Sequence, residues 1–189
     1  MSSLVKVEGP GKTPVVAQEP QQYLTFMLGG EVFATGILRI KEIIEYGQLT
    51  TVPMMPPFIR GMINLRGAVV PVIDLSVRFG RAPVEVTRRT CIVIIEVDGG
   101  ENRQDIGIAV DSVSEVLEIP ANMVEPAPAF GSKIRTDFIQ GMGKVNDRFV
   151  IILNVVNVLS VEEMSQLTLA AQQGGHSMAV VDPDLETAV

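Results

Sequence analysis

A chain of 189 residues, 47% of them hydrophobic and 20% charged, is long enough for one globular domain with tails and too apolar to be intrinsically disordered. Its 15 basic and 22 acidic side chains give a net charge of −7, which argues against nucleic acid as a partner because nucleic-acid-binding proteins are normally basic. The lone histidine, His176, and the lone cysteine, Cys91, exclude a disulfide framework and argue against metal or catalytic sites built on these residues.

The chain begins with residues whose composition cannot support a core. Residues 1–22 are rich in proline, glycine and glutamine, lack the hydrophobic block of a signal peptide, and are expected to form a flexible tail. No apolar run in the sequence approaches the roughly 20 residues that span a bilayer. We therefore expect a cytoplasmic protein with no direct insertion into a membrane.

From residue 23 onward, short runs rich in valine, isoleucine and phenylalanine alternate with glycine, proline, asparagine or aspartate, a pattern typical of β-strands. Strands are predicted over residues 23–28, 32–35, 62–65, 68–74, 91–97, 104–110, 142–145 and 148–153. Gly29 with Gly30, and residues 98–100, fit hairpin turns. Pro71 cannot donate a hydrogen bond to a β-ladder, so it should mark a sheet edge or a bulge.

Two segments have a pattern that fits either a helix or a strand. Residues 37–44 and 113–117 place apolar side chains three and four positions apart, as a helical turn would, but their β-branched residues suit a strand equally well. A later amphipathic run, residues 160–171, is predicted to be a C-terminal helix because Ser160 and Glu163 form a capping box. Residues 174–189 are then expected to form a flexible acidic tail.

The sequence repeats itself. Three pairs of segments match in chain order: 40–45 (IKEIIE) with 113–118 (VSEVLE), 58–62 (FIRGM) with 138–142 (FIQGM), and 70–75 (VPVIDL) with 150–155 (VIILNV). Three ordered matches indicate a duplicated unit, divided at about residues 23–84 and 85–160. Because closing each sheet would remove exposed strand edges, we expect two small β-barrels of similar fold packed on a shared core.

With these motifs in place, the chain resembles the CheW family of chemotaxis coupling proteins over roughly residues 22–165. The strongest match is residues 58–80, FIRGMINLRGAVVPVIDLSVRFG, where the family shows the pattern FI-x-G-x-x-NLRG-x-x-x-P-x-x-DL. The resemblance implies a mainly β, CheW-like domain over residues 23–167, with two SH3-like five-stranded barrels around a shared core and the C-terminal helix. It also implies an adaptor without catalysis, cofactor or metal, which bridges methyl-accepting chemotaxis receptors to the histidine kinase CheA at receptor arrays on the inner face of the membrane.

The resemblance further implies contact residues. Ile40 and Glu42 align with the segment of the family that contacts the kinase, although Glu42 taken alone would be a solvated carboxylate beside a core strip. The residues implied to serve receptor binding or coupling are Gly61, Asn64, Arg66, Val113 and Val116. Taken alone, Arg66 would be an exposed turn arginine, Asn64 a residue that shapes the turn, and the two valines core residues.

Two other functions remain open at this point. A small-ligand-binding β-barrel would need a pocket with convergent polar groups. A coupling protein of a non-flagellar chemosensory array would share the motifs above, so the sequence does not separate it from the leading interpretation.

Overall fold

The computed structural model of the chain describes residues 19–99, 102–129, 134–160 and 162. Its strands are β1 (Gln21–Leu28), β2 (Glu31–Gly36), β3 (Ile40–Glu45), β4 (Ile59–Leu65), β5 (Ala68–Asp74), β6 (Cys91–Gly99), β7 (Asn102–Val110), β8 (Ser112–Ile119), β9 (Val124–Glu125), β10 (Ile139–Val145) and β11 (Arg148–Leu153). Its helices are α1 (Leu75–Arg78) and α2 (Val155–Val158), and its 3-10 helices are η1 (Ile37–Arg39), η2 (Ala121–Met123) and η3 (Thr136–Phe138). The predicted C-terminal helix lies outside the described residues except for Ser160 and Glu162, as do the acidic tail and residues 1–18.

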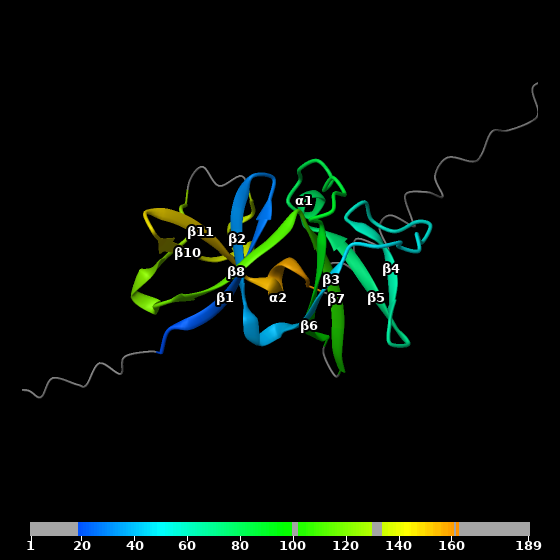
Figure 1. Cartoon of the computed structure of the whole chain (residues 1–189), viewed down its shortest axis with the longest axis horizontal. Helices are drawn as coiled ribbons and strands as arrows, with labels where there is room; N and C mark the ends of the chain where they lie inside the picture. Colours follow the sequence, from blue (N-terminus) through cyan, green and yellow to red (C-terminus); the bar gives the residue numbers. More distant parts are fainter. Residues whose placement is uncertain (1–18, 100–101, 130–133, 161, 163–189) are drawn as a thin grey trace, which may run out of the picture.

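The strands form two sheets, each the basis of one SH3-like barrel subdomain (Figure 1). The six-stranded sheet has the order β8-β1-β2-β11-β10-β9 and the five-stranded sheet the order β3-β6-β7-β5-β4. Each sheet takes strands from both sequence repeats, because the β1–β2 hairpin pairs with β8 and β11 while the β6–β7 hairpin pairs with β3 and β5. The two barrels are therefore interlaced, and neither repeat supplies a whole sheet.

The two segments whose pattern fitted either a helix or a strand, residues 37–44 and 113–117, are mainly strands. Only Ile37–Arg39 forms a helical turn, and β3 follows it at once; the second segment lies wholly within β8. Each of these strands pairs with a strand of the other repeat, β3 with β6 and β8 with β1. This pairing, which no local pattern encodes, decides in favour of the strand.

Pro71 lies in β5, an inner strand of its sheet, rather than at the sheet edge. Pairing of β5 with β7 begins only at the next residue, Val72, so no ladder partner stands beside Pro71 on that side. On the other side its partner is Met62, whose backbone N–H and C=O both bond to Thr50 instead. The Pro71 nitrogen thus points away from β4, and its missing donor leaves no acceptor of the ladder unsatisfied.

Successive residues of the inner strands face different cores. In β6, Val93 and Ile95 enter the large shared core, whereas Ile92 and Ile94 enter a smaller core inside the five-stranded barrel. The shared core contains side chains of both sheets and includes four phenylalanines in a chain of ring contacts, Phe26, Phe33, Phe79 and Phe138. Burial of both faces explains why these strands read as continuous apolar runs in the sequence.

The duplication is visible in matching hydrogen bonds. The Asp74 amide donates to the Phe58 carbonyl at 2.7 Å, and the Asn154 amide donates to the Phe138 carbonyl at 2.8 Å. Asp74 and Asn154 are also the N-caps of α1 and α2, because their side chains accept hydrogen bonds from the first backbone amides of these helices. Both residues thus end equivalent strands and bond local backbone.

Candidate functional site

The proposed kinase-contacting residues lie on β3, an edge strand of the five-stranded sheet. A bulge in the pairing with β6 separates Ile40 from Glu42. Ile40 is half-buried and packs against the shared core. Glu42 is half-buried too, so its carboxylate is less solvated than a surface position would predict.

Ion pairs on the exposed side link β3 to β6 and β7. Lys41 Nζ lies 3.1 Å from a carboxylate oxygen of Glu96 and 2.8 Å from one of Asp105, on β6 and β7 respectively. Hydrogen bonds to Asp105 and then to Glu96 raise the pKa of Lys41. Because Lys41 separates Ile40 from Glu42 in the chain, this cluster fixes the strand that carries both.

The turn between β4 and β5 places Arg66 at the tip of a hairpin. Arg66 and Gly67 both have positive φ values, 53° and 88°, as a two-residue type I′ turn requires. The Gly67 amide donates to the side-chain oxygen of Asn64 at 2.8 Å, so Asn64 shapes the turn as expected. The matching turn of the second repeat, Asn146 and Asp147, has φ values of 48° and 60°.

Glu42 and Arg66, assigned to different partners by the family resemblance, contact each other. Arg66 Nη2 donates to Glu42 Oε2 at 3.2 Å, with the arginine side chain 81% exposed and the glutamate side chain 24% exposed. An ion pair this solvated contributes about 0–1 kcal/mol to stability. The contact can therefore be exchanged for one with a partner at little cost to the fold.

Gly61 is required by a close approach of two chain segments. A Cβ at this position would lie 2.7 Å from the Thr50 carbonyl oxygen. The same carbonyl accepts a hydrogen bond from the Met62 amide at 2.8 Å, which straps the loop before β4 onto the strand. Gly141 is equivalent, since a Cβ there would lie 3.1 Å from the Glu125 carbonyl oxygen and 2.5 Å from a Val124 side-chain atom. The geometry gives Gly61 an architectural role.

Val113 and Val116 lie on β8, in the other barrel. Val113 is half-buried and packs against the shared core, as expected for a core residue, whereas Val116 is 51% exposed. The structure thus brings together Glu42, Asn64 and Arg66 at one end of the five-stranded barrel, while the two valines belong to a separate surface.

An open groove of about 1330 Å³ lies on the six-stranded barrel. It is lined by η1, where Leu38 is 98% exposed, by α2, and by the open end of the β1–β2 hairpin at Tyr23 and Thr35. β8 contributes Ile119 to this groove, not Val113 or Val116. The two valines therefore do not line this groove, and their role remains a prediction.

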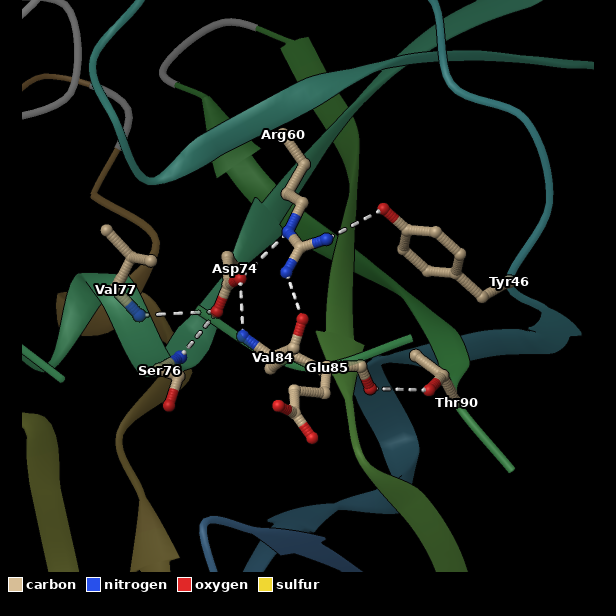
Figure 2. A network of polar contacts seen from close by, with 8 residues as sticks. All are labelled: Tyr46, Arg60, Asp74, Ser76, Val77, Val84, Glu85 and Thr90. Carbon is tan, nitrogen blue, oxygen red and sulfur yellow. Dashed lines mark hydrogen bonds and ion pairs between the residues drawn. The ribbon is translucent and has the colours of Figure 1, made fainter. Parts of the chain in front are cut away.

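A buried ion pair that sequence reasoning missed organises the five-stranded barrel (Figure 2). Arg60 Nε donates to Asp74 Oδ2 at 2.8 Å, and the Asp74 side chain is fully buried. The same carboxylate accepts hydrogen bonds from the backbone amides of Ser76, Val77 and Val84 at 2.9, 3.2 and 3.0 Å. These four donors satisfy the hydrogen-bonding capacity of the carboxylate within the protein, as a buried carboxylate requires.

Arg60 extends this network towards β3. Its guanidinium donates to the Tyr46 hydroxyl at 3.2 Å and to the Val84 carbonyl, as Figure 2 shows. Burial lowers the pKa of Arg60, but the hydrogen bonds to Tyr46 and Asp74 outweigh it and the net shift is upward. Tyr46 directly follows β3, so the network fixes the end of the strand that carries Glu42. The one signal in the sequence was the repeat itself, in which Arg60 and Asp74 align with the neutral Gln140 and Asn154.

No group of three or more histidine, cysteine, aspartate or glutamate residues in the described part of the chain could hold a metal ion. Among the helices that the structure describes, none has the length and apolar character to cross a bilayer.

The comparisons with known proteins agree with this architecture. The family model of the CheW-like domain matches residues 22–163. The chain is 37% identical to the chemotaxis protein CheW of Klebsiella aerogenes over 145 residues, which covers 77% of this chain and 85% of that protein, and 32% identical to that of Bacillus subtilis, with 80% and 94% covered. It superposes on the crystal structure of the scaffolding protein TtCheW from Thermoanaerobacter tengcongensis with a TM-score of 0.68 at 35% identity, which covers 75% of this chain and 94% of that one.

Proposed function

Because the chain belongs to the CheW-like family, we propose that it is a chemotaxis coupling protein that bridges methyl-accepting chemoreceptors to the histidine kinase CheA. The observation that carries the proposal is the extent of the match, which runs from residue 22 to residue 163 and so includes both barrels. A bridge needs two partner surfaces in a fixed relation. The shared core supports this role, since side chains of both sheets pack into it.

The proposed kinase contact is formed by Ile40 and Glu42. The Lys41 cluster fixes β3 between these two residues and the Arg60 network fixes it beyond Glu42, so the strand is preorganised for binding. A partner cation would take the place of Arg66 at the Glu42 carboxylate. Arg66 would then be free to engage the receptor or the kinase, as the family resemblance implies for this turn.

The proposed receptor and coupling contacts are Gly61, Asn64, Arg66, Val113 and Val116. Gly61 and Asn64 act through the backbone, by allowing the strap at Thr50 and by shaping the turn that presents Arg66. Val116 offers an exposed apolar side chain, of the kind that anchors an amphipathic helix. None of these roles requires a reacting group, and we infer an adaptor that works in the cytoplasm at receptor arrays on the membrane.

Co-sedimentation tests the proposal. Purified protein is mixed with CheA and with membranes that either contain or lack chemoreceptors, and the pellets are analysed after centrifugation. We expect the protein to sediment only with receptor-containing membranes, and CheA to join the pellet in larger amount when the protein is present. A thermal-shift screen of small ligands runs in parallel. A specific ligand shift without receptor or CheA binding would favour a small-ligand barrel and overturn the proposal.

A further inference from the structure

The loop that joins the two sequence repeats presents a preformed basic surface. Between α1 and β6, the buried Thr90 closes the segment from Glu85 to Thr90, because its hydroxyl donates to the Glu85 carbonyl at 3.2 Å (Figure 2). The same hydroxyl accepts a hydrogen bond from the Thr87 amide at 2.8 Å. The Arg89 amide donates to the Thr87 hydroxyl at 3.2 Å. The backbone is thus fixed while the side chains of the loop point outward.

Those outward side chains are Val86, Arg88 and Arg89, all exposed. Val86 is 53% exposed. Most other Lys and Arg side chains of the described residues form ion pairs, whereas neither Arg88 nor Arg89 has a described carboxylate within ion-pair distance. Two adjacent free guanidinium groups beside an exposed valine, on a chain with a net charge of −7, form a binding surface for a short acidic and apolar segment.

The chain itself contains such a segment outside the described residues. Residues 180–189 read VVDPDLETAV, with three carboxylates, Asp182, Asp184 and Glu186, set among valine and leucine. Arg78 of α1 donates to the Val158 carbonyl of α2 at 3.0 Å, so the end of α2 lies against the helix that precedes the loop.

The connecting lengths allow contact. The 10 residues from Arg78 to Arg88 span at most about 35 Å, and the roughly 20 residues from 160 to 180 can span about 70 Å. Tethering matters because exposed ion pairs are weak individually. A segment of the same chain acts at an effective concentration on the order of millimolar, so that even a weak contact is populated without any partner.

We propose that residues 180–189 dock on the surface formed by Val86, Arg88 and Arg89 of the same chain. The carboxylates pair with the two guanidinium groups, and the valines or Leu185 cover Val86. Because the pairs are exposed, the contact weakens as salt rises, and an acidic surface of a binding partner competes with it. The basic loop is therefore partly masked in the free protein and becomes available when the segment leaves.

Paramagnetic relaxation tests this contact in the full chain. A nitroxide is attached at position 188 of the Cys91→Ser/Ala188→Cys variant, and line broadening is measured at the amides of Val86, Thr87 and Thr90. We expect these signals to lose several-fold more intensity than those of the β10–β11 turn at low salt, and the difference to vanish at 0.5 M NaCl. The same loss of broadening is expected in Arg88→Ser/Arg89→Ser.

The matched control is Lys144→Ser/Arg148→Ser, which removes two exposed cations from the other barrel and should leave the broadening intact. Broadening at the loop no greater than at the β10–β11 turn would overturn the proposal, as would broadening that persists in Arg88→Ser/Arg89→Ser. Broadening seen only when the labelled chain is mixed with isotope-labelled, nitroxide-free chain would place the segment on a second copy and overturn the intramolecular assignment.

Discussion

Among the described residues, the ion-pair partner of Glu42 is a solvated arginine, so binding and folding can be separated at this residue. We predict that Glu42→Lys weakens CheA binding by 30-fold or more, because an unpaired charge in an interface costs about 2–5 kcal/mol. The melting temperature should change by only a few degrees, since the lost ion pair with Arg66 contributes about 0–1 kcal/mol. Isothermal calorimetry with CheA and a thermal melt measure the two effects.

Glu45→Lys is the matched control, because Glu45 lies on the same strand and is exposed. It makes the same change of charge without touching the Glu42–Arg66 pair, and its affinity for CheA should stay within a few-fold of the parent. Equal loss of affinity in both variants would point to long-range electrostatics rather than to a specific contact. Unfolding of Glu42→Lys would show that Glu42 is a structural residue.

Variants of Asp74 and Arg60 test stability rather than binding. We predict that Asp74→Asn lowers the free energy of unfolding by about 3–5 kcal/mol, because it leaves the partly buried guanidinium of Arg60 without its counter-charge. The double variant Arg60→Gln/Asp74→Asn, which installs the residues of the second repeat, should be destabilised less than Asp74→Asn alone. Urea denaturation of the parent, of Arg60→Gln and Asp74→Asn alone, and of the double variant measures these effects, and a double variant as unstable as the sum of the two single variants would contradict this account.

Among the elements, the strands with both faces buried were the easiest to predict. The predicted strands 91–97, 104–110 and 148–153 each contain an unbroken run of apolar residues or glycine (92–95, 106–110 and 149–153), and these runs lie in β6, β7 and β11. The one-turn helices α1 and α2 were missed, because four residues carry no periodicity. Their only local signal is the N-cap, Asp74 or Asn154, at the end of a strand.

The pairing of strands across the repeats could not be predicted. A pattern of apolar residues says which face of a strand is buried, but the partner of an edge is a non-local choice. β3 and β8 became strands because β6 and β1 offered free edges, a fact of the assembled fold. The candidate site shows the same limit: the turn at Asn64 was predicted from its residue types, whereas the contact between Glu42 and Arg66 depends on how β3 lies against the β4–β5 hairpin.

The strap between β4 and the preceding loop gives a prediction at the scale of elements. Gly61→Ala should lower the free energy of unfolding by about 1–3 kcal/mol, because its Cβ would meet the Thr50 carbonyl at 2.7 Å and one backbone must move. Gly36→Ala is the control, since a Cβ there has nothing within 4 Å, and its stability should change little. Chemical denaturation distinguishes them. If Gly61→Ala kept full stability but lost receptor coupling, Gly61 would be a contact residue rather than an architectural one.

For the whole molecule, the presence of strands from both repeats in each sheet predicts how the two repeats behave when separated. Residues 21–84 and residues 85–160 expressed separately should each lack a stable fold, because each sheet needs strands from both. Mixing the two fragments should restore β-sheet circular dichroism and dispersed amide signals in an NMR spectrum. Dispersed signals from either fragment alone would show that a repeat can build its own barrel, against the pairing described above.

The interlaced order of strands also has a consequence for synthesis on the ribosome. β2 ends at Gly36, but β11, which pairs with it, begins at Arg148. At about 5–20 residues per second, the nascent chain waits roughly 6–22 s between the two. The outer edge of β1 stays open until β8 (Ser112–Ile119) has emerged, the outer edge of β2 stays open until β11 has emerged, and until then the six-stranded barrel cannot close. Nascent chains on neighbouring ribosomes present the same open edges, so crowding on one messenger RNA competes with correct folding more severely than it would for two barrels arranged in sequence.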